Sequence, residues 1–310
     1  METRRVTFRS NGLNLVGDLR IPDNAGHKPV PGVVLTGPLC SVKEQVTGNY
    51  ARRLAEAGFV TLAFDHRNFG ESEGEPRQEE DPQGRIHGLR NAVSFLGTLP
   101  EVDHDAIGVV GVCLGAGSAL HEVAFDPRVK ALSLIAGGYY TPAKLRRRFG
   151  ADFFEQRIRE WAYAAQNQFN TGQPEYLPAV DGSGGDAAMP GPEPWEYYGT
   201  DRAASPHWVN RVTKSSLWTF FATDDTFAVH FISPTPMLIV HGRSDLYCPP
   251  EDAQEIYENA GEPKQIVWLD TTNHIDLYDQ EPYVSRAVNE TVAWFNKYLT
   301  KSENQVTVGG

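Results

Sequence analysis

The stretch Val109–Gly117, which reads VVGVCLGAG, decides the fold. Its centre, GVCLG at 111–115, has the form Gly-x-Ser-x-Gly of an enzyme's nucleophile turn, with Cys113 in place of serine. Such a turn needs a strand before it, flanking glycines that allow a tight bend, and a following helix that offers free N–H groups. Ile107–Val112 is an apolar strand candidate, and Gly115–Ala124 has small residues suited to a closely packed helix. The sequence therefore predicts Cys113 as a nucleophile, with a small, buried, inert thiol as the alternative.

A second stretch, Gly70–Gly74, reads GESEG and matches the serine pattern fully. It lacks the required context, because Asp65–Phe69 separates it from the preceding apolar run and Glu75–Pro82 is a charged segment interrupted by proline. We expect Ser72 to face water with no helix behind it. Cys113 is the preferred nucleophile.

Short apolar runs alternate with helical stretches along most of the chain. The alternating segment Leu13–Leu19 predicts an early antiparallel strand. The other expected strands are Gly32–Thr36, Val60–Phe64, Ile107–Val112, Ala131–Ile135, Met237–His241 and Gln265–Leu269. The expected helices are Tyr50–Ala57, Ile86–Leu99, Gly115–Ala124, Pro250–Asn259 and Pro282–Leu299. Strands that are apolar throughout and alternate with helices predict a parallel sheet covered on both faces.

Residues 141–231 interrupt this alternation with many aromatic side chains and a segment rich in Gly and Pro, Asp181–Pro194. We expect helices that pack over the sheet as a cap, most of the rings forming the cap's own core and some lining a pocket beneath it. The predicted domains are a core of residues 1–140 and 232–300, a helical cap of residues 141–231, and a flexible tail of residues 301–310.

Two loops at the carboxyl ends of expected strands supply partners for the thiol. Asp245 follows the run Met237–His241, and His274 follows Gln265–Leu269. Open α/β sheets build their sites along this edge, which places both residues near Cys113. A nucleophile, an acid and a histidine in that chain order form a catalytic triad. Other histidines are interpreted as structural: His66, His121 and His241.

The chain resembles the α/β-hydrolase superfamily over nearly its whole length. Within it, the sequence is similar to dienelactone-hydrolase-like proteins and to the polyketide-transferase and thiohydrolase group, in which cysteine at the nucleophile turn is a familiar variant. The resemblance is carried by residues 41–45 (SVKEQ), 64–67 (FDHR), 70–72 (GES), 111–115 (GVCLG), 126–131 (DPRVKA), 241–245 (HGRSD) and 274–278 (HIDLY). It implies an α/β-hydrolase fold with a mostly parallel eight-stranded sheet flanked by helices and a helical cap insertion.

The loop after the first parallel strand departs from many relatives, because it reads Thr36-Gly37-Pro38-Leu39-Cys40. In this fold the loop donates one N–H to the oxyanion, and Pro38 has none. We therefore expect the oxyanion hole to consist of the N–H groups of Leu39 and Leu114. Dienelactone hydrolases also use an acid on this loop to control their thiol. Glu44 is the nearest candidate for such an acid behind the thiol, with helix capping or a structural salt bridge as the alternative.

A cysteine triad predicts acyl-enzyme chemistry on a thioester, lactone or activated ester, since a thioester intermediate is uphill from an amide. The aromatic cap favours a bulky apolar acyl group, free or bound to a carrier protein or CoA. Hydrolysis is the first interpretation. An acyltransferase or cyclase of polyketide biosynthesis and a catalytically silent ligand-binding protein are the alternatives.

The composition of the 310-residue chain limits its partners, cofactors and cellular location. A net charge of −12 argues against nucleic acid and anionic membranes as partners. Neither a secretory leader nor a long apolar run is evident, so we expect a soluble cytoplasmic protein and leave a homodimer open. The three cysteines lack metal-ligand spacing, and we expect no metal and no cofactor. Cys40 and Cys248 are interpreted as incidental thiols at the catalytic edge, with a disulfide or redox role as the alternative.

Overall fold

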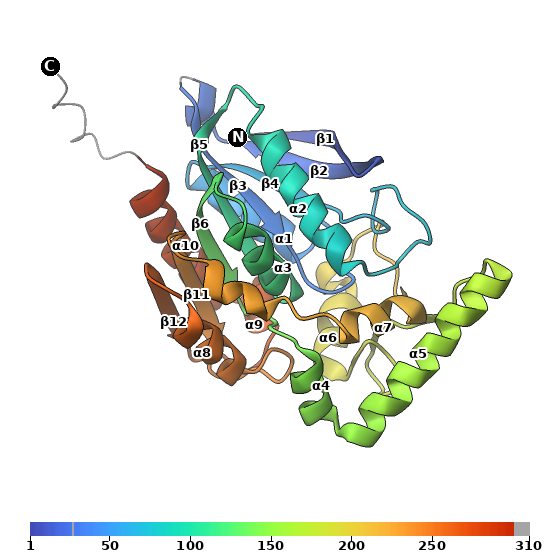
Figure 1. The fold of residues 1–310 in the computed structure, drawn as a ribbon. Helices are drawn as coiled ribbons and strands as arrows, with labels where there is room; N and C mark the ends of the chain where they lie inside the picture. Colours follow the sequence, from blue (N-terminus) through green and yellow to red (C-terminus); the bar gives the residue numbers. More distant parts are fainter. Residues whose placement is uncertain (27, 301–310) are drawn as a thin grey trace, which may run out of the picture.

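The structure is a computed structural model that describes residues 1–26 and 28–300, and an eight-stranded sheet forms its centre (Figure 1). The strand order is β1-β2-β4-β3-β5-β6-β11-β12. The pairs β1–β2 and β2–β4 are antiparallel, and all later pairs, from β4–β3 to β11–β12, are parallel. The strands are β1 Glu2–Ser10, β2 Leu13–Ile21, β3 Val30–Thr36, β4 Val60–Phe64, β5 Val102–Val112, β6 Val129–Ile135, β11 Met237–Gly242 and β12 Lys264–Leu269. The predicted mostly parallel sheet is confirmed.

Helices cover both faces of this sheet. On one face lie α1 Val46–Glu56 and α10 Tyr283–Leu299, and on the other lie α2 Pro82–Leu96, α3 Leu114–Ala124 and α8 Pro250–Asn259. The two adjacent core residues Val109 and Val110 of β5 belong to opposite layers, as expected where successive side chains in a strand point to opposite faces. Both layers are apolar, which explains why the central strands are apolar throughout.

Helix α2 begins earlier than the sequence suggested, at Pro82 rather than Ile86. Pro82 occupies the first turn, where its missing N–H costs nothing, and the Asp81 carboxylate accepts a hydrogen bond from the Gly84 N–H at 2.8 Å. The end of the charged segment Glu75–Pro82 therefore forms the N-terminus of α2.

The segment predicted as the cap contains α4 Pro142–Phe149, α5 Ala151–Thr171, α6 Pro192–Tyr198 and α7 Lys214–Phe221, which lie together to one side of the sheet (Figure 1). It also contains two small sheets that the sequence analysis did not predict. One pairs β7 Tyr176–Leu177 with β10 Val212–Thr213, and the other pairs β8 Val180–Asp181 with β9 Met189–Pro190. The division into core and cap stays a prediction, and the predicted tail lies outside the described residues.

The remaining short elements are α9 Asp276–Asp279 and the 3₁₀ turns η1 Asp23–Gly26, η2 Asp201–Ala203 and η3 Thr226–Phe231. No helix within residues 1–26 and 28–300 is long and apolar enough to cross a membrane.

Phe295 provides a test of the layer beneath α10. Its side chain is fully buried and packs edge-on against Phe59 with ring centroids 6.0 Å apart. We expect Phe295→Ala to lower the free energy of unfolding by about 3–5 kcal/mol, because it leaves a cavity. The control Phe169→Ala removes a ring that is 86% exposed on α5 and should change it by less than about 0.5 kcal/mol. Equilibrium urea unfolding measures both, and equal losses would contradict this packing.

Candidate active site

Cys113 sits at the bend between β5 and α3, with φ 55° and ψ −123°. This is a strained conformation for a residue with a side chain. The neighbouring glycines are required by space, because a Cβ on Gly111 would lie 2.6 Å from the Gly115 carbonyl oxygen, and one on Gly115 would lie 2.5 Å from that of Thr36. The predicted strand–turn–helix context of Cys113 is therefore present.

The structure brings Cys113, Asp245 and His274 together at the carboxyl ends of β5, β11 and β12. The His274 Nδ1 lies 2.6 Å from the Asp245 Oδ2, and the Cys113 Sγ lies within 4.8 Å of a ring nitrogen of His274. All three residues are buried. The other Asp245 oxygen accepts hydrogen bonds from the N–H groups of Tyr247 at 2.9 Å and Cys248 at 2.7 Å. Asp245 thereby fixes its own loop and the histidine ring.

The electrostatics of this group favour an ion pair. A hydrogen bond from the Cys248 thiol and the charge of His274 together lower the pKa of the Cys113 thiol well below its ordinary value, although burial opposes them. For His274, burial lowers the pKa, but the charges of Asp245 and Cys113 outweigh it and raise the pKa well above its ordinary value. Both directions favour a thiolate beside an imidazolium over a neutral pair.

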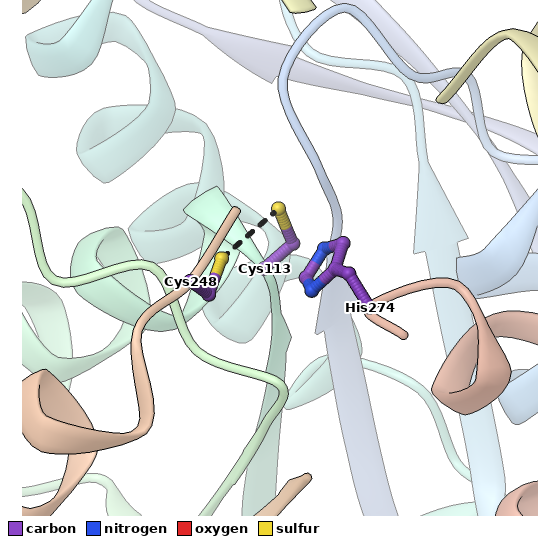
Figure 2. A group of neighbouring side chains, drawn as sticks. All are labelled: Cys113, Cys248 and His274. Carbon is purple, nitrogen blue, oxygen red and sulfur yellow. Dashed lines mark hydrogen bonds between the residues drawn. The ribbon is translucent and has the colours of Figure 1, made fainter. Parts of the chain in front are cut away.

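Cys248 and Tyr278 complete the group. The sequence analysis interpreted Cys248 as incidental, with a disulfide or redox role as the alternative, and assigned no role to Tyr278. The Sγ atoms of Cys248 and Cys113 are 3.8 Å apart (Figure 2). The distance alone allows either sulfur to donate, and burial, which raises the pKa of the Cys248 thiol, favours Cys248 as the donor. The Tyr278 hydroxyl lies 2.9 Å from the His274 Nε2. The four-residue spacing of His274 and Tyr278 is a signal that could have revealed this pair.

The structure places both expected oxyanion donors beside the thiol, since Leu39, Leu114 and Cys113 line one pocket. Leu114 is the first residue of α3, where an N–H has no partner within the helix. The Cys40 N–H donates to the Glu80 carboxylate at 2.7 Å, whereas that of Leu39 has no hydrogen-bond partner in the described part of the chain. Leu39 is thus the residue whose N–H this loop leaves free, and its role as an oxyanion donor stays a prediction.

A buried ion pair that sequence reasoning missed holds the Leu39 loop in place. The Arg85 guanidinium pairs with Glu80 at 2.7 Å and donates to the carbonyl oxygens of Gly37 and Pro38, each at 3.0 Å. Arg85 and Glu80 are 2% and 3% exposed. Because α2 supplies Arg85, it positions the loop across the sheet edge, a contact that no local sequence pattern encodes.

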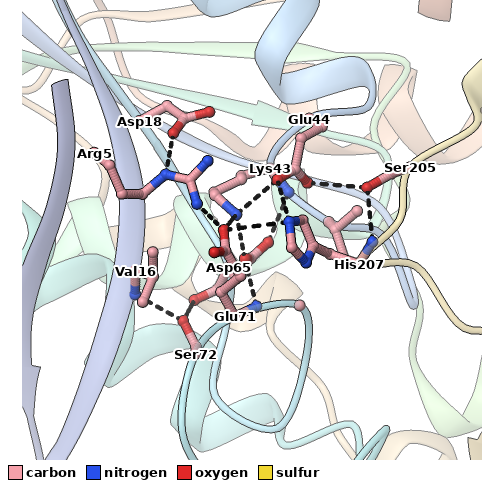
Figure 3. Close-up of polar contacts among 12 residues, drawn as sticks. Arg5, Val16, Asp18, Lys43, Glu44, Asp65, Glu71, Ser72, Ser205 and His207 are labelled. Atoms are coloured by element: carbon pink, nitrogen blue, oxygen red, sulfur yellow. Dashed lines mark hydrogen bonds and ion pairs between the residues drawn. The ribbon is translucent and has the colours of Figure 1, made fainter. Parts of the chain in front are cut away.

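Glu44 and Ser72 both belong to a polar cluster at the β2 side of the core (Figure 3). The Glu44 carboxylate pairs with the buried Lys43 at 2.7 Å and accepts from the Ser205 hydroxyl at 3.3 Å. These contacts are the structural salt bridge left open as the alternative to thiol control. The expectation that Ser72 faces water is wrong, because it is 2% exposed and its hydroxyl donates to the Asp65 carbonyl at 2.6 Å.

The pocket above Cys113 has a volume of about 360 Å³, within the range of roughly 300–1,000 Å³ usual for small-molecule sites. Cys113, His274 and Tyr278 line it. Its walls are mainly apolar, and the rings and aliphatic groups come largely from residues 145–198 and 220–221: Leu145, Phe149, Pro190, Tyr198, Phe220 and Phe221. The expectation that some aromatic residues of 141–231 line a pocket is confirmed for Phe149, Tyr198, Phe220 and Phe221.

One set of side chains here has the composition of a soft-metal site. Cys113 Sγ, Cys248 Sγ and a His274 nitrogen lie within 4.8 Å of one another. An ion bound to all three would occupy the Cys113 sulfur and block it as a nucleophile. The prediction that the chain works without a metal stays a prediction.

Comparison with known proteins places this geometry in a family. A family model named Hydrolase_4 and described as serine aminopeptidase, S33 matches residues 45–281. The chain belongs to this α/β-hydrolase family. The family description names a serine enzyme, whereas this chain has Cys113 at the nucleophile turn.

Three relatives within this family are similar to the chain over most of its length. The Pseudomonas aeruginosa protein PA2218, described as uncharacterized, is 36% identical in sequence over 90% of this chain and 77% of its own length. Its crystal structure superposes with a TM-score of 0.86, at 32% identity over 96% of this chain and 94% of the other. A thiohydrolase, aneE, of Aspergillus aculeatus is 29% identical over 86% and 84% of the two chains.

The polyketide transferase grgF of a Penicillium species is 28% identical over 86% and 87%, and its structure gives a TM-score of 0.80 at 25% identity over 96% and 99%. The predicted α/β-hydrolase fold is confirmed, and the chain is an enzyme of the hydrolase or acyltransferase class. The expected likeness to thiohydrolases and polyketide transferases is confirmed, and that to dienelactone hydrolases stays a prediction.

Asp245→Asn tests whether the Asp245 carboxylate favours the charged forms of His274 and Cys113. Without the carboxylate the His274 imidazolium loses its main stabilising charge, so the proton returns to sulfur and the pKa of Cys113 rises. We expect alkylation of Cys113 by iodoacetamide at pH 6 to slow by about tenfold for each unit of that rise. The control Asp270→Asn, at the same sheet edge but exposed and paired with Arg243, should leave the rate unchanged. Equal rates in the two variants would show that Asp245 does not act through charge.

Proposed function

We propose that this enzyme transfers acyl groups through Cys113, which takes the acyl group from a thioester, lactone or activated ester and releases it to water or another acceptor. The observation that supports this most is a thiol, with lowered pKa, that lines an apolar pocket next to the His274–Asp245 pair. A silent binding protein would have no need of that thiolate–imidazolium arrangement.

In the first half-reaction the Cys113 thiolate attacks the carbonyl carbon of the substrate. The carbonyl oxygen becomes an oxyanion that the N–H groups of Leu39 and Leu114 stabilise. The bond to the leaving group then breaks, and the His274 imidazolium gives its proton to the departing thiolate or alkoxide. The acyl group remains on sulfur as a thioester, and His274 is left neutral.

In the second half-reaction neutral His274 accepts a proton from the incoming acceptor through Nε2. Asp245 holds Nδ1–H and so keeps the ring in the tautomer that leaves Nε2 free to act as a base. The acceptor oxygen or nitrogen attacks the thioester, the C–S bond breaks, and the thiolate–imidazolium pair is restored. In the structure the Tyr278 hydroxyl lies 2.9 Å from Nε2, and this contact gives way to the acceptor in this step.

The identity of the nucleophile restricts the substrate. Exchange of one thioester for another is nearly isoenergetic, while formation of a thioester from an unactivated amide is uphill. We therefore favour thioesters, lactones and activated esters over the peptides that the family description suggests. The apolar walls of the pocket favour a bulky apolar acyl group, delivered free or on CoA or a carrier protein.

Two fates of the acyl group are supported by relatives, one named a thiohydrolase and others named polyketide transferases. We propose hydrolysis first, with transfer to an alcohol or amine, or cyclisation, as the second candidate. Both use the same intermediate and differ only in the acceptor that reaches it.

Intact-protein mass spectrometry tests the intermediate. After brief exposure to a panel of apolar acyl thioesters, we expect the wild-type chain to gain the mass of one acyl group, located on Cys113 by peptide mapping. Cys113→Ala should gain none and should lose turnover by at least about a thousandfold. Cys40→Ala, which removes another buried thiol near the site, should still be acylated.

Acylation elsewhere in the wild type, or undiminished turnover by Cys113→Ala, would contradict the proposal. Binding of an acyl compound with neither an adduct nor turnover would favour a silent binder. Addition of a long-chain alcohol separates the two fates, because a transferase forms the ester in preference to the free acid.

A further inference from the structure

The neighbouring thiols of Cys113 and Cys248 could react with each other by oxidation, a chemistry that acyl transfer does not use. Cys113 and Cys248 are both buried, and their Sγ atoms are 3.8 Å apart (Figure 2). Cys113 lines the pocket, while Cys248 lies behind it on the loop after β11 and is fully buried. A small reagent that enters the pocket therefore meets Cys113 first, with Cys248 next to it.

The two sulfurs also differ in protonation, which gives them different roles. The hydrogen bond from Cys248 and the charge of His274 lower the pKa of Cys113, whereas burial raises that of Cys248, which favours a thiolate at Cys113 and a thiol at Cys248. Peroxides oxidise thiolates, and redox-sensing cysteines are typically accessible thiolates with a resolving cysteine beside them. The geometry of Cys113 and Cys248 meets that description.

We propose that Cys113 and Cys248 form a reversible disulfide when the protein meets hydrogen peroxide or an organic hydroperoxide, and that this bond switches the nucleophile off. The inference adds redox control to the proposed function. Its chemistry needs the reactive sulfur of Cys113 but no acyl substrate.

The reaction proceeds in two steps. The Cys113 thiolate attacks a peroxide oxygen, the O–O bond breaks, and the leaving hydroxide takes the proton of the His274 imidazolium, which gives a sulfenic acid and water. Neutral His274 then accepts the proton of Cys248 and passes it to the hydroxide that leaves when the Cys248 sulfur attacks the sulfenic sulfur. Two thiols and one hydrogen peroxide become one disulfide and two waters, with sulfur oxidised and oxygen reduced. A His274 nitrogen lies within 4.8 Å of both sulfurs, so a small side-chain movement brings it within reach of either.

Cys248 decides whether the oxidation can be reversed. A sulfenic acid with no thiol beside it is oxidised further to sulfinic acid, which ordinary thiols do not reduce. Cys40 is equally buried, but its pKa is raised by burial and the charge of Glu80, and no sulfur contact of Cys40 is seen within residues 1–26 and 28–300. Cys40 is therefore the matched control for Cys248.

The test treats purified wild-type protein, Cys248→Ser and Cys40→Ala with excess hydrogen peroxide and measures intact mass without reduction. We expect wild type and Cys40→Ala to lose two hydrogen atoms, to show a peptide cross-link between residues 113 and 248, and to lose reactivity of Cys113 toward iodoacetamide. Dithiothreitol should restore mass and reactivity. Cys248→Ser should instead gain two or three oxygen atoms on Cys113 that dithiothreitol does not remove.

Absence of the 113–248 cross-link in oxidised wild type would overturn the proposal, whatever Cys248→Ser does. So would full recovery of Cys248→Ser by dithiothreitol. Alkylation of Cys113 in untreated Cys248→Ser shows that the variant retains its site. A wild type that forms the cross-link but is not acylated by any donor would overturn the proposed function and leave the redox inference standing.

Discussion

The bend at Cys113 determines where every other part of the site has to be. A residue with a side chain is held at φ 55° between the central strand β5 and helix α3, and glycines at 111 and 115 are the residues that this close approach allows. The sulfur is thereby raised to the sheet edge next to the free N–H groups at the start of α3. Such strain persists only where the surrounding structure imposes it, and two apolar layers do so here.

A buried thiolate at that point is stable only with compensation. The carboxylate of Asp245, the ring of His274 and the thiol of Cys248 provide it, and all three come from loops after β11 and β12. Asp245 has two structural roles, because one carboxylate oxygen holds the His274 ring and the other accepts a hydrogen bond from the Cys248 N–H. The same thiol that stabilises the anion is then the nearest group able to capture an oxidised Cys113, so that activation and protection arise from one contact.

Local sequence patterns predicted much of the fold and of the candidate site. The Gly-x-Cys-x-Gly turn, and the acid and histidine that follow apolar strands, were predicted because strand order and chain order are coupled in this fold. The Glu80–Arg85 support of the Leu39 loop and the burial of Ser72 were not, since both arise from contacts between distant segments. Cys248 was read as incidental because chain spacing does not show that it faces Cys113. The two-residue strands β7 to β10 are too short to give any periodic signal.

The central claim is that Cys113 rests as a thiolate paired with the His274 imidazolium. The most direct measurement is a pH titration of thiolate ultraviolet absorbance, taken as the difference between wild type and Cys113→Ala. The account predicts a thiolate signal that is already present at about pH 6, well below the ordinary cysteine pKa of about 8.5. A signal that appears only near pH 8.5 or above would mean that the thiol rests protonated, and the account would be wrong.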